Sequence, residues 1–171
     1  MRLRLVKEPF DNPDYIFELK HDGFRALAYI ENGECRPVSR NLKSLRFESL
    51  RAALGKLPVS NAIIDGEIIC LDRKGVSPFN WLLNGHQADQ SLLYAFDLLW
   101  LDGDDLRRLP LVVRKKRVND LIRSSDGCRI LYAQHIDAAG KEFFNESAVA
   151  TSKESWRNER WACTERTVPI G

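Results

Sequence analysis

Long apolar runs are missing from this sequence. No segment approaches the roughly 20 apolar residues that a membrane-spanning helix requires. The first ten residues, MRLRLVKEPF, also lack an apolar stretch long enough for a signal peptide. We therefore expect a cytoplasmic protein with no membrane partner.

Paired cysteine spacings and a strong excess of one charge are missing as well. The four cysteines and three histidines are scattered along the chain, which argues against a disulfide framework and against structural zinc. The 26 basic residues are mixed with 24 acidic ones, so the net charge of +2 does not by itself indicate a nucleic-acid partner. Any contact with nucleic acid must then come from a local cluster of charge.

The composition and length are typical of one globular domain. A chain of 171 residues is long enough to bury a sizeable core. With 44% hydrophobic and 29% charged residues, the sequence is unlike those of disordered or fibrous proteins. We expect it to be a monomer.

The apolar patterns predict an α+β fold with antiparallel and mixed sheets, in which most strands pair as hairpins and helices lie between them. The predicted strands are residues 16–20, 24–30, 35–39, 62–72, 91–101 and 128–134, and the predicted helices are residues 45–57, 113–122 and 138–146. Segment 62–72, AIIDGEIICLD, is either one strand with a charged centre or a hairpin that turns at Asp65 and Gly66. Residues 147–171 have no sustained period of either kind, so we expect a loosely ordered tail.

The stretch FELKHDGFRALAYI, residues 17–30, raises a question of charge. Asp22-Gly23 is a pair that favours a two-residue hairpin turn, which would place Lys20 opposite Arg25 at about 5 Å between Cβ atoms. At an effective dielectric constant of about 20, two unit charges this close repel by roughly 3 kcal/mol. A bound anion would relieve the repulsion, and a nearby guanidinium would lower the pKa of the lysine and favour the nucleophilic amine. The alternative is a solvated hairpin end with two surface charges.

Four motifs follow one another along the chain: KHDGFR at residues 20–25, SRN at 39–41, DGE at 65–67 and YAFD at 94–97. Their order and spacing resemble the adenylation domain of ATP-dependent DNA ligases, within the covalent nucleotidyltransferase superfamily. The flanking segments EPFDNPDYIFELKHDGFRALAYI and FDLLWLDGDDLRRLPLVVRKKRVNDLI are most similar to bacterial ligases of the end-joining and repair type. The resemblance covers residues 5–146. It implies the ATP-grasp-like nucleotidyltransferase fold of DNA ligases.

The resemblance also implies roles for individual residues. Lys20 matches the lysine whose amine attacks the α-phosphate of ATP, which gives a lysyl-AMP phosphoramidate and releases pyrophosphate. Arg25 would hold the nucleotide phosphate, which would be the anion expected between the two cations. Glu67 matches a glutamate that contacts the ribose and helps to place the metal. Without the resemblance, Lys20 would be a plain surface lysine and Glu67 an acidic hairpin end.

Three further residues match binding positions of the family. Phe96 would stack on the adenine ring, although its alternation with the apolar residues of the same strand equally predicts a core residue. Arg40 would contact the ribose or a DNA phosphate, or else be an ordinary loop arginine. Glu18, two residues before the lysine, matches a residue that lines the adenine pocket.

The implied cofactors are ATP and Mg²⁺, because adenylyl transfer builds charge on phosphoryl oxygens that a divalent cation can neutralise. The implied partners are nicked or broken double-stranded DNA and other end-joining proteins. Local basic clusters such as RKKR, residues 114–117, would bind the DNA phosphates. That run could equally be the polar face of a helix.

The sequence departs from the family pattern near Glu146. The family continues with E-G-x-V-x-K, which supplies a metal-site glutamate and a lysine, and then with K-x-K. Here ESAVAT, residues 146–151, has Ser147 in place of the glycine and Thr151 in place of the lysine, and no K-x-K follows. We therefore expect an incomplete adenylation domain over residues 1–146, as a frameshift or deletion would leave, with a divergent tail at 147–171 and no oligonucleotide-binding domain.

Three functions remain open from the sequence. The first is an ATP-dependent DNA ligase domain that acts in DNA repair and recombination, with Glu146 as a weak second metal ligand. The second is a non-catalytic remnant that binds nucleotide or nucleic acid without sealing nicks. The third is an mRNA-capping or RNA-ligase relative, which shares the lysine motif but is disfavoured by the segments that follow Tyr94.

Overall fold

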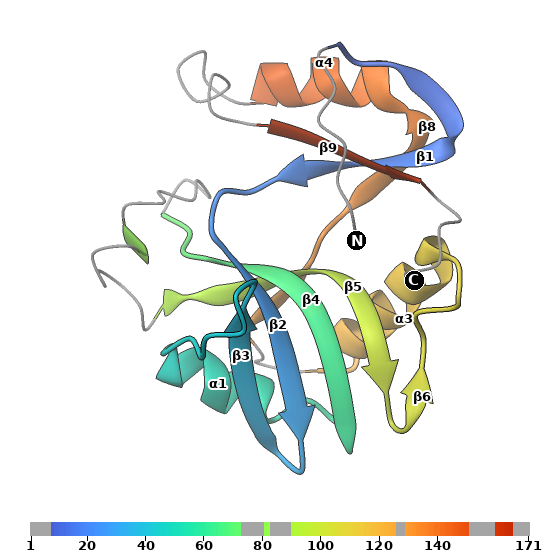
Figure 1. The fold of residues 1–171 in the computed structure, drawn as a ribbon. Helices are drawn as coiled ribbons and strands as arrows, with labels where there is room; N and C mark the ends of the chain where they lie inside the picture. Colours follow the sequence, from blue (N-terminus) through green and yellow to red (C-terminus); the bar gives the residue numbers. More distant parts are fainter. Residues whose placement is uncertain (1–7, 73–80, 83–89, 126–128, 151–159, 166–171) are drawn as a thin grey trace.

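The computed structural model describes residues 8–72, 81–82, 90–125, 129–150 and 160–165. Within these ranges, the side chains of Lys20, of residues 146–150 and of residues 160–165 lie outside the description. The described chain forms two sheets, with helices packed against them (Figure 1). This confirms the α+β fold, with antiparallel and mixed sheets, that the sequence predicts.

The larger sheet has six strands, which are mostly antiparallel. Its order is β3-β2-β4-β5-β6, and β7 pairs with β5 in the parallel direction. The bounds are β2 Phe24–Glu31, β3 Glu34–Ser39, β4 Asn61–Ile69, β5 Leu92–Leu101, β6 Asp104–Asp105 and β7 Ile130–Tyr132. Segment 62–72 is thus a single strand through Asp65 and Gly66, as one of the two sequence alternatives predicts.

Two tight turns join neighbouring strands of this sheet. Asn32 and Gly33 have φ angles of 50° and 81° between β2 and β3, and Asp102 and Gly103 have φ angles of 47° and 95° between β5 and β6. Positive φ at both central positions matches the twist of the flanking strands and favours Asn-Gly and Asp-Gly. The turn predicted at Asp102-Gly103 is confirmed.

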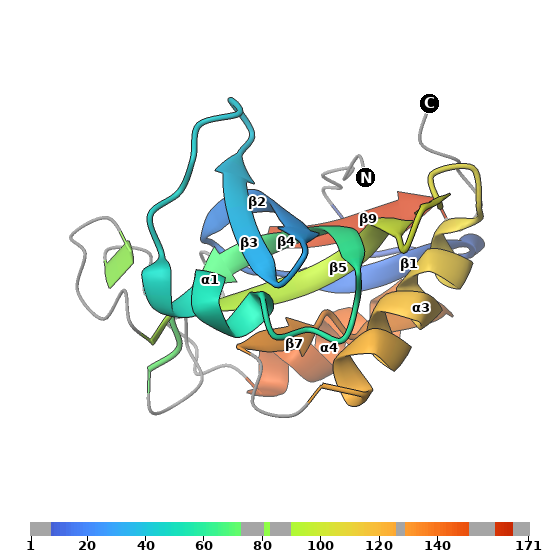
Figure 2. The same cartoon turned by 90° about the horizontal axis from the view of Figure 1, so that it is seen from below.

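Helices α1, Glu48–Leu54, and α3, Leu111–Arg123, cover one face of the six-stranded sheet. Alternate positions of the strands face them, so the core contains Ala26 and Ala28 of β2 together with Leu50 of α1 and Val118 of α3. Figure 2 shows α1 beside β3 and α3 along β5. The predicted helices at 45–57 and 113–122 are therefore present, the first of them shorter than predicted.

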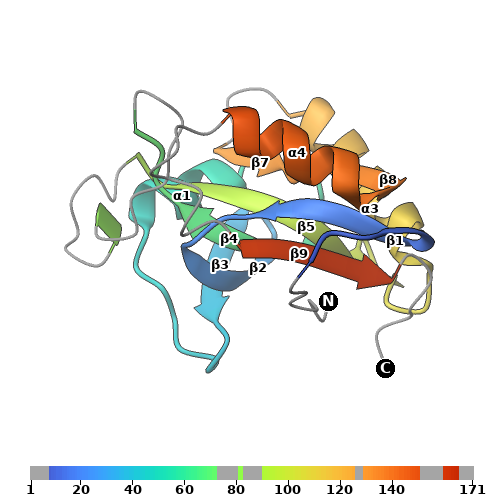
Figure 3. The same ribbon diagram turned by 90° about the horizontal axis from the view of Figure 1, so that it is seen from above.

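The smaller sheet has the order β8-β1-β9, with β1 at Asp11–Lys20, β8 at His135–Ala139 and β9 at Arg160–Glu165. Helix α4, Gly140–Ala150, packs against β1 and β8. Figure 3 shows β1 and β9 lying across β4 and β5 of the larger sheet. None of the helices in the described ranges is long and apolar enough to cross a membrane; the cytoplasmic location stays a prediction.

The hairpin predicted at Asp22-Gly23 is wrong. Strands β1 and β2 belong to different sheets, so Lys20 pairs with Arg160 of β9 while Arg25 pairs with Glu67 of β4. Asp22 and Gly23 are not among the residues with positive φ, which a type I′ turn needs. Gly23 instead allows the backbone to pass close to β4, because a Cβ at this position would lie 2.2 Å from the carbonyl oxygen of Ile68.

Two segments within the predicted tail, residues 147–171, have regular secondary structure, while the boundary at residue 146 and the loose order of the tail stay predictions. Helix α4 continues to Ala150, and β9 pairs with β1 over six residues. Strand pairing across the chain stabilises a segment whose own sequence shows no clear period. The rest of the predicted tail lies outside the described residues.

Candidate functional site

Polar and aromatic side chains gather on the face of the six-stranded sheet that is opposite α1. Arg25 of β2, Glu67 of β4 and Tyr94 of β5 are direct cross-strand neighbours, while the residues that follow Arg25 and Tyr94 are buried in the core. The ring of His21, just after β1, lies edge-on to the ring of Tyr94 at 4.2 Å between centroids. This group therefore lies where β1 leaves the smaller sheet and the chain enters β2.

Arg25 is held by an ion pair and by an aromatic ring. Its Nε and Nη2 atoms donate to the two carboxylate oxygens of Asp65 at 2.7 and 2.6 Å. Its guanidinium carbon lies 4.0 Å from the centroid of the Phe96 ring. The guanidinium therefore covers one face of the Phe96 ring.

Phe96 occupies a β-bulge. Gly66 pairs with Ala95 and Asp65 pairs with Asp97, so Phe96 is an extra residue in β5 between two pairs. A bulge interrupts the alternation of side chains and re-aims the residues next to it. Phe96 and Asp97 are consequently both buried, although they are neighbours in a strand.

Glu67 is half-buried at the entrance to β2. Its Oε1 accepts the N–H of Gly23 at 3.2 Å, and its backbone lies opposite that of Arg25. The sequence predicted Glu67 and Arg25 as parts of one site, and the structure brings them together through strand pairing.

Glu18 is buried on β1 and forms an ion pair with Lys115 of α3. The Nζ atom of Lys115 lies 2.5 Å from Oε1 of Glu18 and also donates to the carbonyl oxygens of Phe96 and Ala133, each at 3.2 Å. Burial raises the pKa of the Glu18 carboxyl, and the positive charge of Lys115 opposes that shift. Tyr132 is close to this pair, with the centroid of its ring 4.9 Å from Nζ.

Arg114, the residue before Lys115, binds a second buried carboxylate. Its Nε and Nη2 donate to Asp97 at 2.8 and 3.0 Å, and its Nη1 donates to the carbonyl oxygen of Leu109. The run RKKR is therefore no surface cluster of four cations: Arg114 and Lys115 point into the protein, whereas Lys116 and Arg117 are exposed. The prediction of a four-residue DNA-binding cluster is wrong because two of its members neutralise buried acids.

The other predicted residues are placed as follows. Arg40 is exposed in the turn after β3, whose last residue, Ser39, pairs with Ala26 beside Arg25. The backbone of Lys20 ends β1, and the backbone of Glu146 lies in α4. The side chains of Lys20 and Glu146 lie outside the described residues, so their predicted roles stay predictions.

Metal ligands do not cluster in the part of the chain that the structure describes, where no group of three or more His, Cys, Asp or Glu residues could hold an ion. Asp65 is tied to Arg25, which leaves Glu67 as the predicted ligand near the site. Mg²⁺ commonly binds one or two carboxylates together with substrate phosphates and water, and does not need a cage of protein ligands. A single carboxylate such as that of Glu67 would be sufficient as the protein ligand of such an ion.

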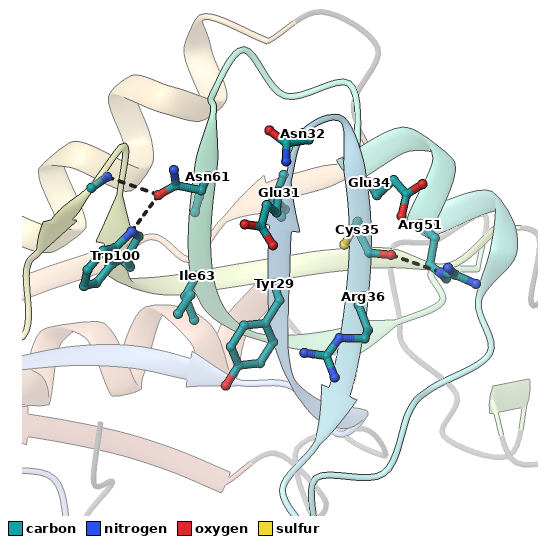
Figure 4. A pocket seen from close by; sticks show the side chains of 13 residues that line it. Tyr29, Glu31, Asn32, Glu34, Cys35, Arg36, Arg51, Asn61, Ile63 and Trp100 are labelled. Atoms are coloured by element: carbon teal, nitrogen blue, oxygen red, sulfur yellow. Dashed lines mark hydrogen bonds between the residues drawn. The ribbon is translucent and has the colours of Figure 1, made fainter.

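An open groove of about 880 Å³ lies farther along the six-stranded sheet, near the two tight turns (Figure 4). Tyr29, Arg36, Ile63 and Trp100 line it, and the guanidinium carbon of Arg36 lies 5.2 Å from the centroid of the Tyr29 ring. None of the catalytic, nucleotide-binding or metal-binding residues predicted from the sequence lines the groove. It is therefore a feature separate from the group around Arg25.

Four residues of the site have roles that the sequence motifs did not predict: Asp65, Asp97, Arg114 and Lys115. A signal for them was present, because a carboxylate inside an apolar strand is costly unless a cation reaches it. Asp97 and Glu18 are two such buried carboxylates, and each requires a cation. The adjacent basic residues Arg114 and Lys115 of α3 supply them. Only the fold shows which carboxylate each cation binds.

Known proteins share sequence similarity with most of this chain. The family model of the ATP dependent DNA ligase domain matches residues 3–153. Over 127 residues the chain is 34% identical to the multifunctional non-homologous end joining protein LigD of Pseudomonas aeruginosa, and over 136 residues it is 28% identical to a DNA ligase of Pyrobaculum arsenaticum. The aligned parts cover 71% of this chain in both cases, but only 15% and 23% of those relatives.

Solved structures show the same fold. A structure of mycobacterial DNA ligase D complexed with ATP and MES superimposes with a TM-score of 0.79 at 24% identity, over 95% of this chain and 52% of that one. The ligase domain of LigD from M. tuberculosis gives the same TM-score at 23% identity. The chain thus spans about half of these solved ligase structures.

Proposed function

This chain belongs to the family of ATP-dependent DNA ligase domains, and on that premise we propose that it forms a covalent lysyl-AMP intermediate at Lys20 as the first step of joining DNA breaks. The observation that carries the proposal is the convergence of Arg25, Glu67 and Phe96, from three different strands, where β1 ends at Lys20. Glu18 also lies on β1. Its ion-pair partner, Lys115, donates a hydrogen bond to the backbone carbonyl oxygen of Phe96.

The proposed reaction is an exchange of bonds at the α-phosphorus of ATP. The neutral amine of Lys20 attacks the phosphorus, a phosphorus–nitrogen bond forms, and the bond to the bridging oxygen of the leaving pyrophosphate breaks. The amine loses a proton to water. Mg²⁺ held by Glu67 and the phosphates would supply positive charge for the leaving group.

Arg25 and Phe96 have clear tasks in this proposal. Asp65 holds Arg25 as a fixed donor beside the nucleotide and balances its charge. Adenine would stack on the face of the Phe96 ring opposite Arg25. Glu18 would line the adenine pocket, and Arg40 would contact the ribose or a DNA phosphate.

DNA is the partner that the family suggests. We propose that nicked or broken double-stranded DNA is bound through its phosphates by exposed cations, including Lys116 and Arg117 of α3. The Pseudomonas relative is a non-homologous end joining protein. This suggests a role in DNA repair and recombination beside other end-joining proteins.

A second candidate function is nucleotide or nucleic-acid binding without catalysis. One observation favours it: Ser147 and Thr151 stand where the family motif has a glycine and a lysine. Loss of one preorganised donor to a reacting phosphate commonly costs about two to three powers of ten in rate. Such a protein would bind ATP but transfer its adenylyl group slowly or not at all.

Labelling with nucleotide separates these functions. ATP labelled at the α-phosphate is incubated with the chain and Mg²⁺, and the proposal predicts label on the protein that acid removes and that Lys20→Ala abolishes. Lys43→Ala is the matched control, because Lys43 is an exposed loop lysine. ATP binding without label would favour the non-catalytic function, and label from GTP in place of ATP would favour the capping relative.

A further inference from the structure

Lys115 is a fully buried lysine whose three ammonium protons all have acceptors. The acceptors are Oε1 of Glu18 and the carbonyl oxygens of Phe96 and Ala133. They belong to β1, to β5 and to the connection between β7 and β8. One ammonium group therefore joins the smaller sheet to the larger one.

Packing alone does not account for a lysine at this position. The desolvation of two charges costs several kcal/mol per ion, and a buried ion pair is often no more stable than apolar residues of the same volume. A methionine has nearly the same length and would fill the space without that cost. What the ammonium adds is direction, because its three hydrogen bonds fix the positions of the groups around it.

Two of those groups are the residues assigned to the base of the nucleotide. Lys115 binds the side chain of Glu18 and the backbone of Phe96, so it fixes the carboxylate relative to the aromatic ring. Only Oε1 of Glu18 takes part, and no described residue donates a hydrogen bond to Oε2. The carboxylate thus retains one acceptor atom.

We propose that Lys115 is a positioning residue that holds Glu18 as an ionised acceptor for the 6-amino group of a purine stacked on Phe96, and so makes the site selective for adenine nucleotides. This inference rests on the proposed function, because it takes the base to lie on Phe96. It assigns to Lys115 no contact with the nucleotide, since all three of its ammonium protons already have acceptors within the protein.

The test compares ATP with purine riboside triphosphate, which lacks only the 6-amino group. Equilibrium dissociation constants are measured for the wild type, Lys115→Met and the control Lys56→Met, whose lysine is exposed in the turn after α1 and has no part in the proposed site. A hydrogen bond to a charged acceptor predicts a preference for ATP of about tenfold or more in the wild type and the control. In Lys115→Met the preference should fall close to one.

Lys115→Met leaves a buried carboxylate without its cation and could unfold the chain, so Glu18→Gln/Lys115→Met is measured beside it. The double variant removes both charges, and we expect it to fold and to lack the preference as well. Chemical unfolding reports the stability of each variant. A purely structural role for Lys115 would change the stability and leave the ratio of the two dissociation constants unchanged.

Each outcome decides a different point. If the wild type binds neither nucleotide, the proposed function fails and this inference fails with it. If the wild type binds both equally, nucleotide binding stands but the role of Glu18 and Lys115 is refuted. A folded Lys115→Met, or a folded double variant, that keeps the wild-type preference would also overturn the inference.

Discussion

Removal of the Asp97 carboxylate should strongly destabilise the protein. The side chains of Asp97 and Arg114 are 0% and 1% exposed, and they share two hydrogen bonds of 2.8 and 3.0 Å. In Asp97→Ala the guanidinium stays buried with only the carbonyl oxygen of Leu109 as an acceptor. Breaking a buried ion pair in this way costs about 3–5 kcal/mol, against the roughly 5–15 kcal/mol by which a domain of this kind is stable.

Urea denaturation followed by circular dichroism measures this loss. With a slope of about 2 kcal/mol per molar urea, a loss of about 3 kcal/mol lowers the midpoint by about 1.5 M. The matched control is Asp105→Ala, which breaks an ion pair of similar geometry, with hydrogen bonds of 2.9 and 2.7 Å to Arg107. These two side chains are 35% and 53% exposed, so we expect no measurable shift in the midpoint.

A second variant separates the uncompensated charge from the loss of packing. Arg114→Met in the Asp97→Ala background removes the buried guanidinium, and we expect it to recover a large part of the lost stability. The reasoning would be refuted if Asp97→Ala lowered the midpoint no more than Asp105→Ala does. It would also be refuted if the added Arg114→Met made the protein still less stable.

Three further predictions concern the region around the site and the core. Gly23→Ala should lower the free energy of unfolding by about 1–3 kcal/mol, measured by urea denaturation, because its Cβ would lie 2.2 Å from the carbonyl oxygen of Ile68; an unchanged midpoint would contradict the close approach. Glu67→Gln should change the free energy of unfolding by no more than about 1 kcal/mol, because an amide oxygen can still accept the N–H of Gly23. The same variant should transfer label from ATP at least about tenfold more slowly, because it lacks a metal-binding charge. Equal rates in the variant and the wild type would remove Glu67 from the proposed site. Cys35 and Cys70 should resist thiol reagents at pH 8 in the native protein, as peptide mapping would report, because burial raises the pKa of both thiols and takes that of Cys35 to about 12; fast modification of the folded chain would show that these sites open.

Local patterns in the sequence were sufficient for most individual elements. The spacing of Leu50 and Leu54 predicts the buried side of α1, and both side chains are fully buried there. The apolar run that contains Phe96 predicts a strand that ends at Leu101, just before the turn at Asp102, as β5 does. These features depend on neighbours within a few residues, which a single sequence records directly.

Pairing between distant segments could not be predicted in the same way. Both strands that pair with β1 come from the last third of the described chain. The pair Asp22-Gly23 indicates that the chain changes direction, but not which strand pairs with β1. The bulge at Phe96 leaves no trace in the alternation of the strand. The run RKKR also does not indicate that its first two residues form ion pairs with Asp97 and Glu18, which lie on other elements.

Mass spectrometry of the intact chain after incubation with ATP and Mg²⁺ tests the central claim most directly. The account predicts a mass increase of one adenylyl group, located by peptide mapping at Lys20, absent in Lys20→Ala and retained in Lys43→Ala. A folded wild-type chain that gains no adenylyl group, or one that carries it on a residue other than Lys20, would contradict the account.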